Sequence, residues 1–210
     1  MSPPGRPKGE YQHMSAMLTP DWPVPATVLA ACSTREGGVS AAPYDTLNLG
    51  DHVGDDPARV AENRRRFAAA LRARPVFLQQ VHGWDVARVA ADTPDGTQAD
   101  ACWTTERGVA CTIMVADCLP VLLADRAGRV VGAAHCGWRG LAGRDGQGVL
   151  EALWAQMQPR MAATPEGAGA AALAWLGPCI GPQAFEVGPE VREAFVAQDA
   201  GAAAAFRPHG

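Results

Sequence analysis

The chain has 210 residues, a formal net charge of −4 and 19% charged residues, values typical of an ordinary globular protein with one large or two small domains. With 18 basic against 22 acidic residues, it lacks the excess of positive charge that marks nucleic-acid binding, so we expect no nucleic-acid partner. No run reaches the ~18 apolar residues of a membrane span and the start has no apolar signal core, so we expect a cytoplasmic protein without membrane contact.

The first third of the chain predicts a leader, a strand and a helix, in that order. Residues 1–25 are rich in proline and polar residues and predict a flexible leader. A buried strand is expected over residues 27–35, where an apolar run meets a glycine turn. Residues 55–75 give the clearest helical pattern, with Asp56 as N-cap and Pro57 in the first turn.

The rest of the chain alternates short strands with two helices. The expected strands are 76–83, 85–90, 101–105, 109–118 and 172–182, with a β-hairpin over 119–137. Helices are expected over 146–158 and 188–198. Strands outnumber helices and mostly follow one another, which favours an α+β fold with mixed or antiparallel sheets.

Two of the five histidines stand at ends of predicted strands. His82 follows one strand, His135 ends another, and both lie close to glycines. Cys118 interrupts an apolar run between two strands in the same manner. Side chains at strand ends commonly point into clefts, so these three residues favour a shared site over core packing.

A His2Cys set leaves the fourth tetrahedral position of zinc open for water or substrate. Copper competes for the same donors, because His2Cys is also the blue-copper set. A multicopper oxidase needs far more than five histidines, so polyphenol oxidation with copper ranks lowest.

Two further hypotheses stay open. One is a Cys-His hydrolase or amidase with Cys118 as nucleophile, and the other is a non-catalytic metal-binding partner of other proteins.

Polar residues beside turns complete the candidate site. Asp117 directly precedes Cys118 and is a candidate for orienting a ligand or for general-base chemistry. Arg35, Asn48 and Arg139 lie near turn glycines. Arginines beside exposed backbone are suited to holding a phosphate group.

Several motifs together resemble the laccase-domain family, first called multicopper polyphenol oxidoreductase and now described as purine nucleoside phosphorylase with adenosine deaminase activity. The segments that carry the resemblance are "STREGGVS", "PYDTLNLGDHVGDDPARVAENRRRF", "LQQVHG", "ADCLPVLLAD", "AAHCGWRGLAG" and "WLGPCIGP" followed by "FEVGPEV". The resemblance implies two packed mixed β-sheets flanked by helices, in α/β/β/α layers, as in a cytotoxic-factor-like cysteine hydrolase fold. It also implies a single domain over residues 26–210 that lacks the family's usual C-terminal segment.

The resemblance further implies a site and an activity. It places three residues on the family's zinc ligands and catalytic centre: His82, Cys118 and His135. Three others fall on motif positions that face the pocket: Arg35, Asn48 and Arg139. The implied reactions are phosphorolysis of adenosine, inosine or methylthioadenosine and deamination of adenosine to inosine, with Asp117 or a histidine assisting proton transfer. The implied partners are purine nucleosides and phosphate, and the implied assembly is a monomer or small homo-oligomer. Cys136 replaces the alanine that the family usually has.

Overall fold

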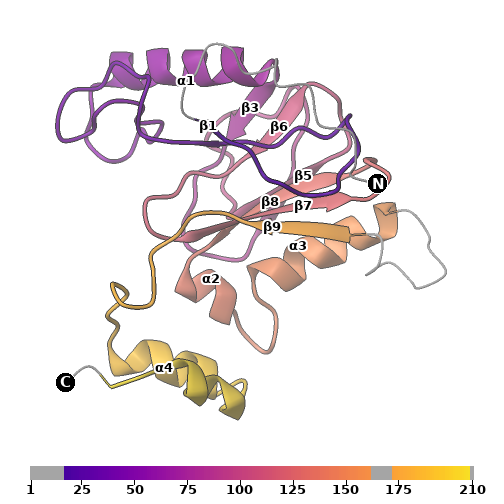
Figure 1. The fold of residues 1–210 in the computed structure, drawn as a ribbon. Helices are drawn as coiled ribbons and strands as arrows, with labels where there is room; N and C mark the ends of the chain where they lie inside the picture. The colour runs from indigo at the N-terminus through magenta and orange to yellow at the C-terminus, as the bar shows by residue number, and fades with distance from the viewer. Residues whose placement is uncertain (1–16, 162–171, 209–210) are drawn as a thin grey trace, which may run out of the picture. The chain divides into compact units, whose positions relative to one another are not determined.

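The computed structural model describes residues 17–161 and 172–208 (Figure 1). These residues divide into two compact units. The first unit comprises residues 17–21 and 29–75, and the second comprises 22–28 together with the described residues from 76 onward. Of the leader predicted for 1–25, Met17–Leu18 form strand β1, and residues 1–16 lie outside the described residues. The single domain expected over 26–210 stays a prediction.

The first unit is built around one helix. Helix α1 spans Pro57–Leu71, and the Asp56 carboxylate caps it by accepting a hydrogen bond from the Ala58 N–H at 2.8 Å. The predicted helix, its N-cap and its first-turn proline are therefore confirmed. The strand expected over 27–35 is much shorter than predicted, because only β2, Cys32–Ser33, pairs with β1 in an antiparallel ladder.

A buried asparagine on α1 holds the long loop between β2 and α1. Asn63 is completely buried, and its Oδ1 accepts a hydrogen bond from the Val39 N–H at 2.9 Å. Its Nδ2 donates to Ser40 Oγ at 2.9 Å, to the Thr46 carbonyl at 3.2 Å and to the Asn48 carbonyl at 2.8 Å. One side chain thus satisfies polar groups that would otherwise be buried without partners.

The second unit contains a five-stranded mixed sheet with the order β4-β5-β8-β7-β9. Strand β4 runs parallel to β5, and all the other neighbours are antiparallel. The strand bounds are β4 Val86–Arg88, β5 Ala101–Thr104, β7 Leu119–Asp125, β8 Val131–Cys136 and β9 Ala172–Leu176. A separate two-stranded sheet pairs β3, Arg74–Phe77, with β6, Val109–Thr112.

Strands β7 and β8 form the predicted hairpin. Their register runs from Leu119 opposite Cys136 to Ala124 opposite Val131. The turn contains Gly128 at φ +70°, a conformation that suits glycine because it has no Cβ. The expected hairpin is therefore confirmed.

Helices and the two-stranded sheet cover the two faces of the five-stranded sheet. Helix α3, Val149–Met157, lies along one face of the sheet (Figure 1). Its Val149, Leu153 and Met157 side chains belong to the apolar cluster that also includes residues of the sheet. The other face meets the β3–β6 sheet in a second apolar cluster that includes Cys102. The remaining elements are α2 Trp138–Ala142, the 3₁₀ helix η1 Gln158–Arg160, α4 Pro189–Val196 and the 3₁₀ helix η3 Ala200–Ala205.

This arrangement confirms an α+β fold with several sheets and few helices. The finer expectation of a cytotoxic-factor-like cysteine hydrolase fold in four layers stays a prediction. Within the described ranges, no helix is both long and apolar enough to cross a membrane.

Candidate metal centre

Three side chains from separate segments converge in the second unit. His82 lies in the segment that follows β3, Cys118 stands directly before β7, and His135 lies near the end of β8. Their ligand atoms all lie within 4.8 Å of one another, so they form a group that could bind a metal ion. His82 is exposed, Cys118 is half-buried and His135 is buried, so the group is open to solvent on one side.

The strand alternation of the hairpin separates Cys136 from this group. Successive side chains along a strand point to opposite faces, and Cys136 belongs to the core beneath α3. His135 therefore points away from that core, towards Cys118. Burial, together with Cys118 and Glu151, raises the pKa of Cys136 to about 12, so this thiol stays protonated inside the core.

A buried carboxylate connects the two histidines. Asp100, directly before β5, accepts hydrogen bonds from three consecutive backbone N–H groups, those of Val81 at 3.0 Å, His82 at 2.9 Å and Gly83 at 2.8 Å. Its Oδ1 also lies 2.8 Å from His135 Nδ1. One completely buried side chain therefore fixes the backbone of one histidine and the ring of the other.

The contact with Asp100 determines which nitrogen of His135 can bind metal. A carboxylate only accepts hydrogen bonds, so Nδ1 carries the proton and Nε2 presents its lone pair to the group. Burial raises the pKa of Asp100, but the hydrogen bonds from His135 and from the Gly83, Val81 and His82 amides outweigh it and leave the pKa below its ordinary value. Asp100 is therefore ionised at neutral pH.

A glutamine joins the segments that carry His82 and Cys118. Gln80 Nε2 donates to the Met114 carbonyl at 2.8 Å, and Gln80 Oε1 accepts from the Met114 N–H at 2.8 Å. The strand predicted over 109–118 therefore ends early, at Thr112, because a side chain takes the backbone bonds of Met114 that a neighbouring strand would need.

The close approach of the three ligands depends on a glycine. A Cβ atom at Gly137 would lie 2.9 Å from His82 Cδ2 and 3.2 Å from Cys118 Sγ, both tighter than ordinary contacts. His82 itself has φ +60°, a left-handed conformation that is uncommon for a residue with a side chain. The hydrogen bond from its N–H to Asp100 helps hold it there.

Two nitrogen donors and one sulfur donor fit zinc chemically. Tetrahedral zinc with bonds of about 2.0–2.3 Å needs donors about 3.3–3.8 Å apart, and the three donors here are all within 4.8 Å of one another. Burial, then Asp117 and Asp100, raise the pKa of the Cys118 thiol. This opposes the metal-free thiolate that a Cys-His hydrolase needs.

The other predicted site residues lie in different settings. Asp117 is exposed, and its backbone carbonyl accepts from the Ile180 N–H at 2.9 Å. The carboxylate that contacts the His135 ring is Asp100, and a role of Asp117 in orienting a ligand or moving a proton stays a prediction. Arg139 is exposed on α2, with Cζ 4.3 Å from the centre of the Trp138 ring.

Arg35 and Asn48 belong to the first unit. Arg35 Nε donates to the Asp45 carbonyl at 2.7 Å, and its Nη2 lies 3.4 Å from the Asp45 carboxylate. Asn48 Nδ2 donates to the Gly50 carbonyl and to Asp55 Oδ2, both at 3.0 Å. Both side chains are thus engaged within their own loop, and their role in substrate binding stays a prediction.

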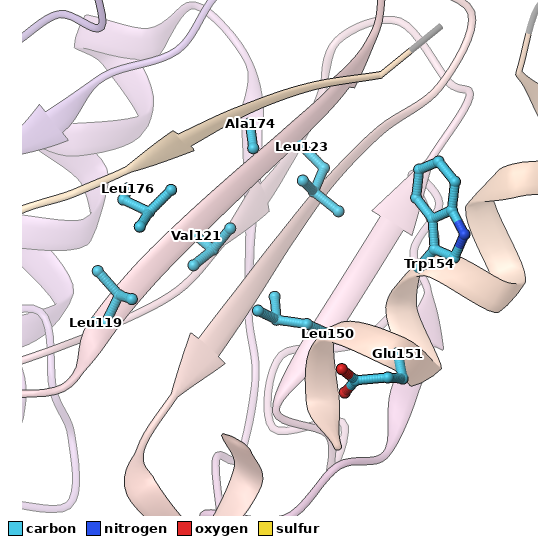
Figure 2. Close-up of a pocket in the computed structure, with 8 residues that line it drawn as sticks. All are labelled: Leu119, Val121, Leu123, Leu150, Glu151, Trp154, Ala174 and Leu176. Carbon is cyan, nitrogen blue, oxygen red and sulfur yellow. The ribbon is translucent and has the colours of Figure 1, made fainter. Parts of the chain in front are cut away.

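A groove between α3 and the sheet lies on the opposite face from the metal group. It has a volume of about 370 Å³ and is lined by Leu119, Val121, Leu123, Leu150, Glu151, Trp154, Ala174 and Leu176 (Figure 2). Leu119, Val121 and Leu123 alternate along β7, so they share a face that residue 118 does not. The groove is therefore separate from the candidate metal centre.

Sequence reasoning missed two residues that build this centre, Asp100 and Gln80. The available signal for Asp100 was a charged residue directly before a buried apolar strand, a position where a carboxylate without partners would be costly. Gln80 lies between the predicted strand and His82 and carries no signal of its own, because its partner is 34 residues away.

Comparisons with known proteins agree with the sequence motifs. A family model described as multi-copper polyphenol oxidoreductase laccase matches residues 29–210. The chain is 56% identical over 195 residues to purine nucleoside phosphorylase PA4543 of Pseudomonas aeruginosa, covering 93% of this chain and 75% of that protein. It is 52% identical over 199 residues to purine nucleoside phosphorylase YfiH of Escherichia coli, covering 94% and 77%. The crystal structure of Neisseria meningitidis protein NMB0706 matches with a TM-score of 0.82 and 40% identity, over 93% of this chain and 76% of that one.

Proposed function

The chain belongs to the multi-copper polyphenol oxidoreductase laccase family, and from this premise we propose that it is a zinc-dependent purine nucleoside phosphorylase. The observation that carries the proposal is the convergence of His82, Cys118 and His135, with ligand atoms within 4.8 Å. Two relatives that are more than half identical to the chain are named purine nucleoside phosphorylase, which supports nucleosides and phosphate as substrates.

The donor set favours zinc over a copper cluster. Two imidazoles and a thiolate leave one tetrahedral position open. Among the residues that the structure describes, this is the one group of its kind, whereas four-copper chemistry needs several sets of histidines. A zinc ion bound here would supply a Lewis acid beside the substrate. A single copper ion would use the same three donors, and analysis of the bound metal distinguishes the two.

The chain's own residues would position the reactants of phosphorolysis. A phosphate oxygen forms a bond to C1′ of the ribose as the C1′–N9 bond breaks, and the purine leaves with that electron pair and takes up a proton. Arg139 is the first candidate for holding phosphate, because it is exposed and lies two residues from Gly137, which borders all three ligands. Asp117, an exposed carboxylate beside Cys118, is the candidate for moving the proton.

Deamination of adenosine to inosine is a second proposed activity. The open fourth position of the metal would suit a water molecule that attacks the purine ring and displaces ammonia. Both activities would use the same ligands. Arg35 and Asn48 are retained as proposed substrate contacts.

The test is product analysis with matched cysteine variants. The zinc-loaded protein is incubated with phosphate and either adenosine or inosine, and the products are identified by mass spectrometry. We expect adenine or hypoxanthine with ribose 1-phosphate, and inosine from adenosine if deamination occurs. Cys118→Ala should lose both zinc and activity, whereas Cys179→Ala, at an exposed cysteine outside the group, should keep both. Full activity of Cys118→Ala, or no product from zinc-loaded protein, contradicts the proposal.

A further inference from the structure

Helix α2 and the turn after it run along the segment that carries His82. Three of its positions, spaced by three and four residues, meet three consecutive residues of that segment in order. A Cβ at Gly137 would lie 2.9 Å from His82 Cδ2, and a Cβ at Gly140 would lie 2.7 Å from the Gly83 carbonyl oxygen. Gly137 is the N-cap of α2 and Gly140 lies within the helix, which ends at Ala142.

The third position in this series is an arginine. Arg144 follows α2 by two residues, and its Cζ lies 5.9 Å from the ring centre of Trp84. Trp84 follows His82 by two residues, which span at most about 7 Å of backbone. A nucleoside whose C1′ lies at the metal group could therefore extend its base towards Trp84 and Arg144.

The backbone of Arg144 is held by a tight turn. Arg144 and Gln147 exchange two backbone hydrogen bonds, at 3.1 and 2.9 Å. The two residues between them, Asp145 and Gly146, have φ +53° and +74°. Asp-Gly with positive φ at both positions is the sequence preference of the type I′ turn.

A second element braces the same turn. Gln198, two residues after the end of α4, accepts a hydrogen bond from the Gly146 N–H at 3.1 Å and donates one to the Ala142 carbonyl. The turn is therefore fixed at its tip and at the end of the helix before it, although Arg144 itself is exposed. An exposed arginine on a braced turn is preorganised for binding.

Two arginine–tryptophan pairs include a tryptophan within three residues of a candidate ligand, and they differ in one respect. Arg139 lies 4.3 Å from the centre of the Trp138 ring, in direct contact. The Cζ atom of Arg144 lies farther from its tryptophan, 5.9 Å from the centre of the Trp84 ring, and Trp84 is 37% exposed. Arg144 forms no ion pair with any residue in the described ranges. Trp84 is therefore partly accessible to solvent and has the Arg144 guanidinium over its ring.

We propose that Trp84 and Arg144 form a purine-binding subsite beside the metal group, in which the base stacks on the indole and Arg144 donates hydrogen bonds to its N7 and O6 edge. This inference rests on the proposed phosphorolysis and adds a specificity to it. Aromatic side chains stack well on nucleobases, and arginine is suited to two adjacent acceptors.

The chemistry of arginine determines which purine the subsite favours. A 6-oxopurine presents two acceptors, N7 and O6, whereas adenine presents an acceptor at N7 and a donor at N6. Arginine only donates, so Arg144 should favour inosine and guanosine over adenosine. A pair of this kind discriminates by roughly 5-fold at the weak end of its range, and we expect that value because the site is open.

The experiment compares Arg144→Gln and Trp84→Leu with matched variants outside the subsite, Arg160→Gln and Trp154→Leu. Binding of hypoxanthine and adenine is measured by calorimetry, and kcat/KM is measured for inosine and adenosine with phosphate. Glutamine pairs with the N6 and N7 edge of adenine, so Arg144→Gln should lower the inosine-to-adenosine ratio at least about 5-fold. Trp84→Leu should weaken both bases by about 5-fold or more, and the control variants should match the wild type.

Binding and turnover separate the two proposals. If the wild type turns over nucleosides but Arg144→Gln leaves the ratio unchanged, the subsite is wrong and the proposed function stands. If the wild type shows no turnover, the binding preference for hypoxanthine and its loss in Arg144→Gln still support the subsite. Absence of purine binding by the wild type overturns the subsite.

Discussion

Each of the two units is organised by one buried polar side chain, and the two side chains differ in charge. In the first unit, Asn63 joins α1 to the preceding loop with four hydrogen bonds. In the second, Asp100 joins three backbone N–H groups to the ring of His135. Both side chains are completely buried, and both connect segments that are distant in sequence.

The difference shows what a charge contributes. The amide of Asn63 has donors and acceptors, and loop backbone and a hydroxyl satisfy all of them, so its bonds close a loop and leave nothing to act on a ligand. The carboxylate of Asp100 only accepts, so it gathers N–H groups and sets the tautomer of His135. Burying an ionised carboxylate costs more free energy than burying a neutral amide. Here the carboxylate lies where it orients the ring of His135.

The largest effect should come from replacing Asp100. Asp100→Asn places an amide N–H among four donors, so at least one buried donor loses its partner. We expect the free energy of unfolding to fall by about 3 kcal/mol and zinc affinity to fall roughly 10- to 100-fold. Urea unfolding and chelator competition measure the two quantities. Asp95→Asn, which alters one exposed carboxylate that accepts from the Phe77 N–H, is the control, and wild-type zinc affinity in Asp100→Asn would refute the orienting role.

Asn63→Ala should separate stability from metal binding. It leaves the Val39 N–H and several loop carbonyls without their buried partner, which should cost about 2 kcal/mol of unfolding free energy. Zinc affinity of the folded protein should stay unchanged, because the three ligands all belong to the other unit. A parallel loss of zinc affinity would show that the hydrogen bonds of Asn63 and those of Asp100 do not act independently.

Gly137→Ala tests the space between the ligands. The added methyl group would press on His82 and Cys118, and we expect a cost of about 1 kcal/mol in zinc binding, roughly fivefold in affinity. Gly181→Ala is a matched control, because a Cβ there meets nothing within 4 Å. Equal zinc affinities in the two variants would mean that the site relaxes freely around the methyl group.

The smallest effect concerns a surface carboxylate on α1. Hydrogen bonds from Arg65 and Arg66 lower the pKa of Glu62 from 4.5 to about 2. Because folding lowers this pKa, the carboxylate stabilises the protein above pH 4.5, and the contribution disappears as the pH falls through about 2. Glu62→Gln should therefore be slightly less stable than the wild type at neutral pH and indistinguishable from it below pH 2 in urea unfolding. A difference that is independent of pH would contradict this origin.

Local signals in the sequence predicted the elements whose causes are local. The N-cap Asp56, the first-turn proline and the helical spacing lie within α1 itself, and the hairpin of β7 and β8 has its turn signal between its own strands. The strand predicted over 109–118 was wrong beyond Thr112, because the side chain that ends it is Gln80, far away in sequence. The strand propensity of neighbouring residues carries no information about a partner so far away in sequence.

The candidate ligands were predictable for a related reason. His82 and His135 stand at ends of predicted strands, and Cys118 interrupts an apolar run. Polar residues at such positions can be recognised from the neighbouring sequence. Their convergence was then a geometric hypothesis, and the structure brings the three ligand atoms together. Asp100 was not predicted, since its partners at residues 81–83 and 135 come together only through tertiary pairing.

The bonds of Asp100 also bear on how the surface exchanges hydrogen with solvent. His82 is exposed by area, yet its amide and those of Val81 and Gly83 are bonded to a carboxylate with no solvent access. Exchange of these amides requires an opening that uncovers Asp100, so they should be protected for longer than their surface position suggests. The same opening breaks the contact with His135, and the two histidines therefore loosen as one cooperative unit.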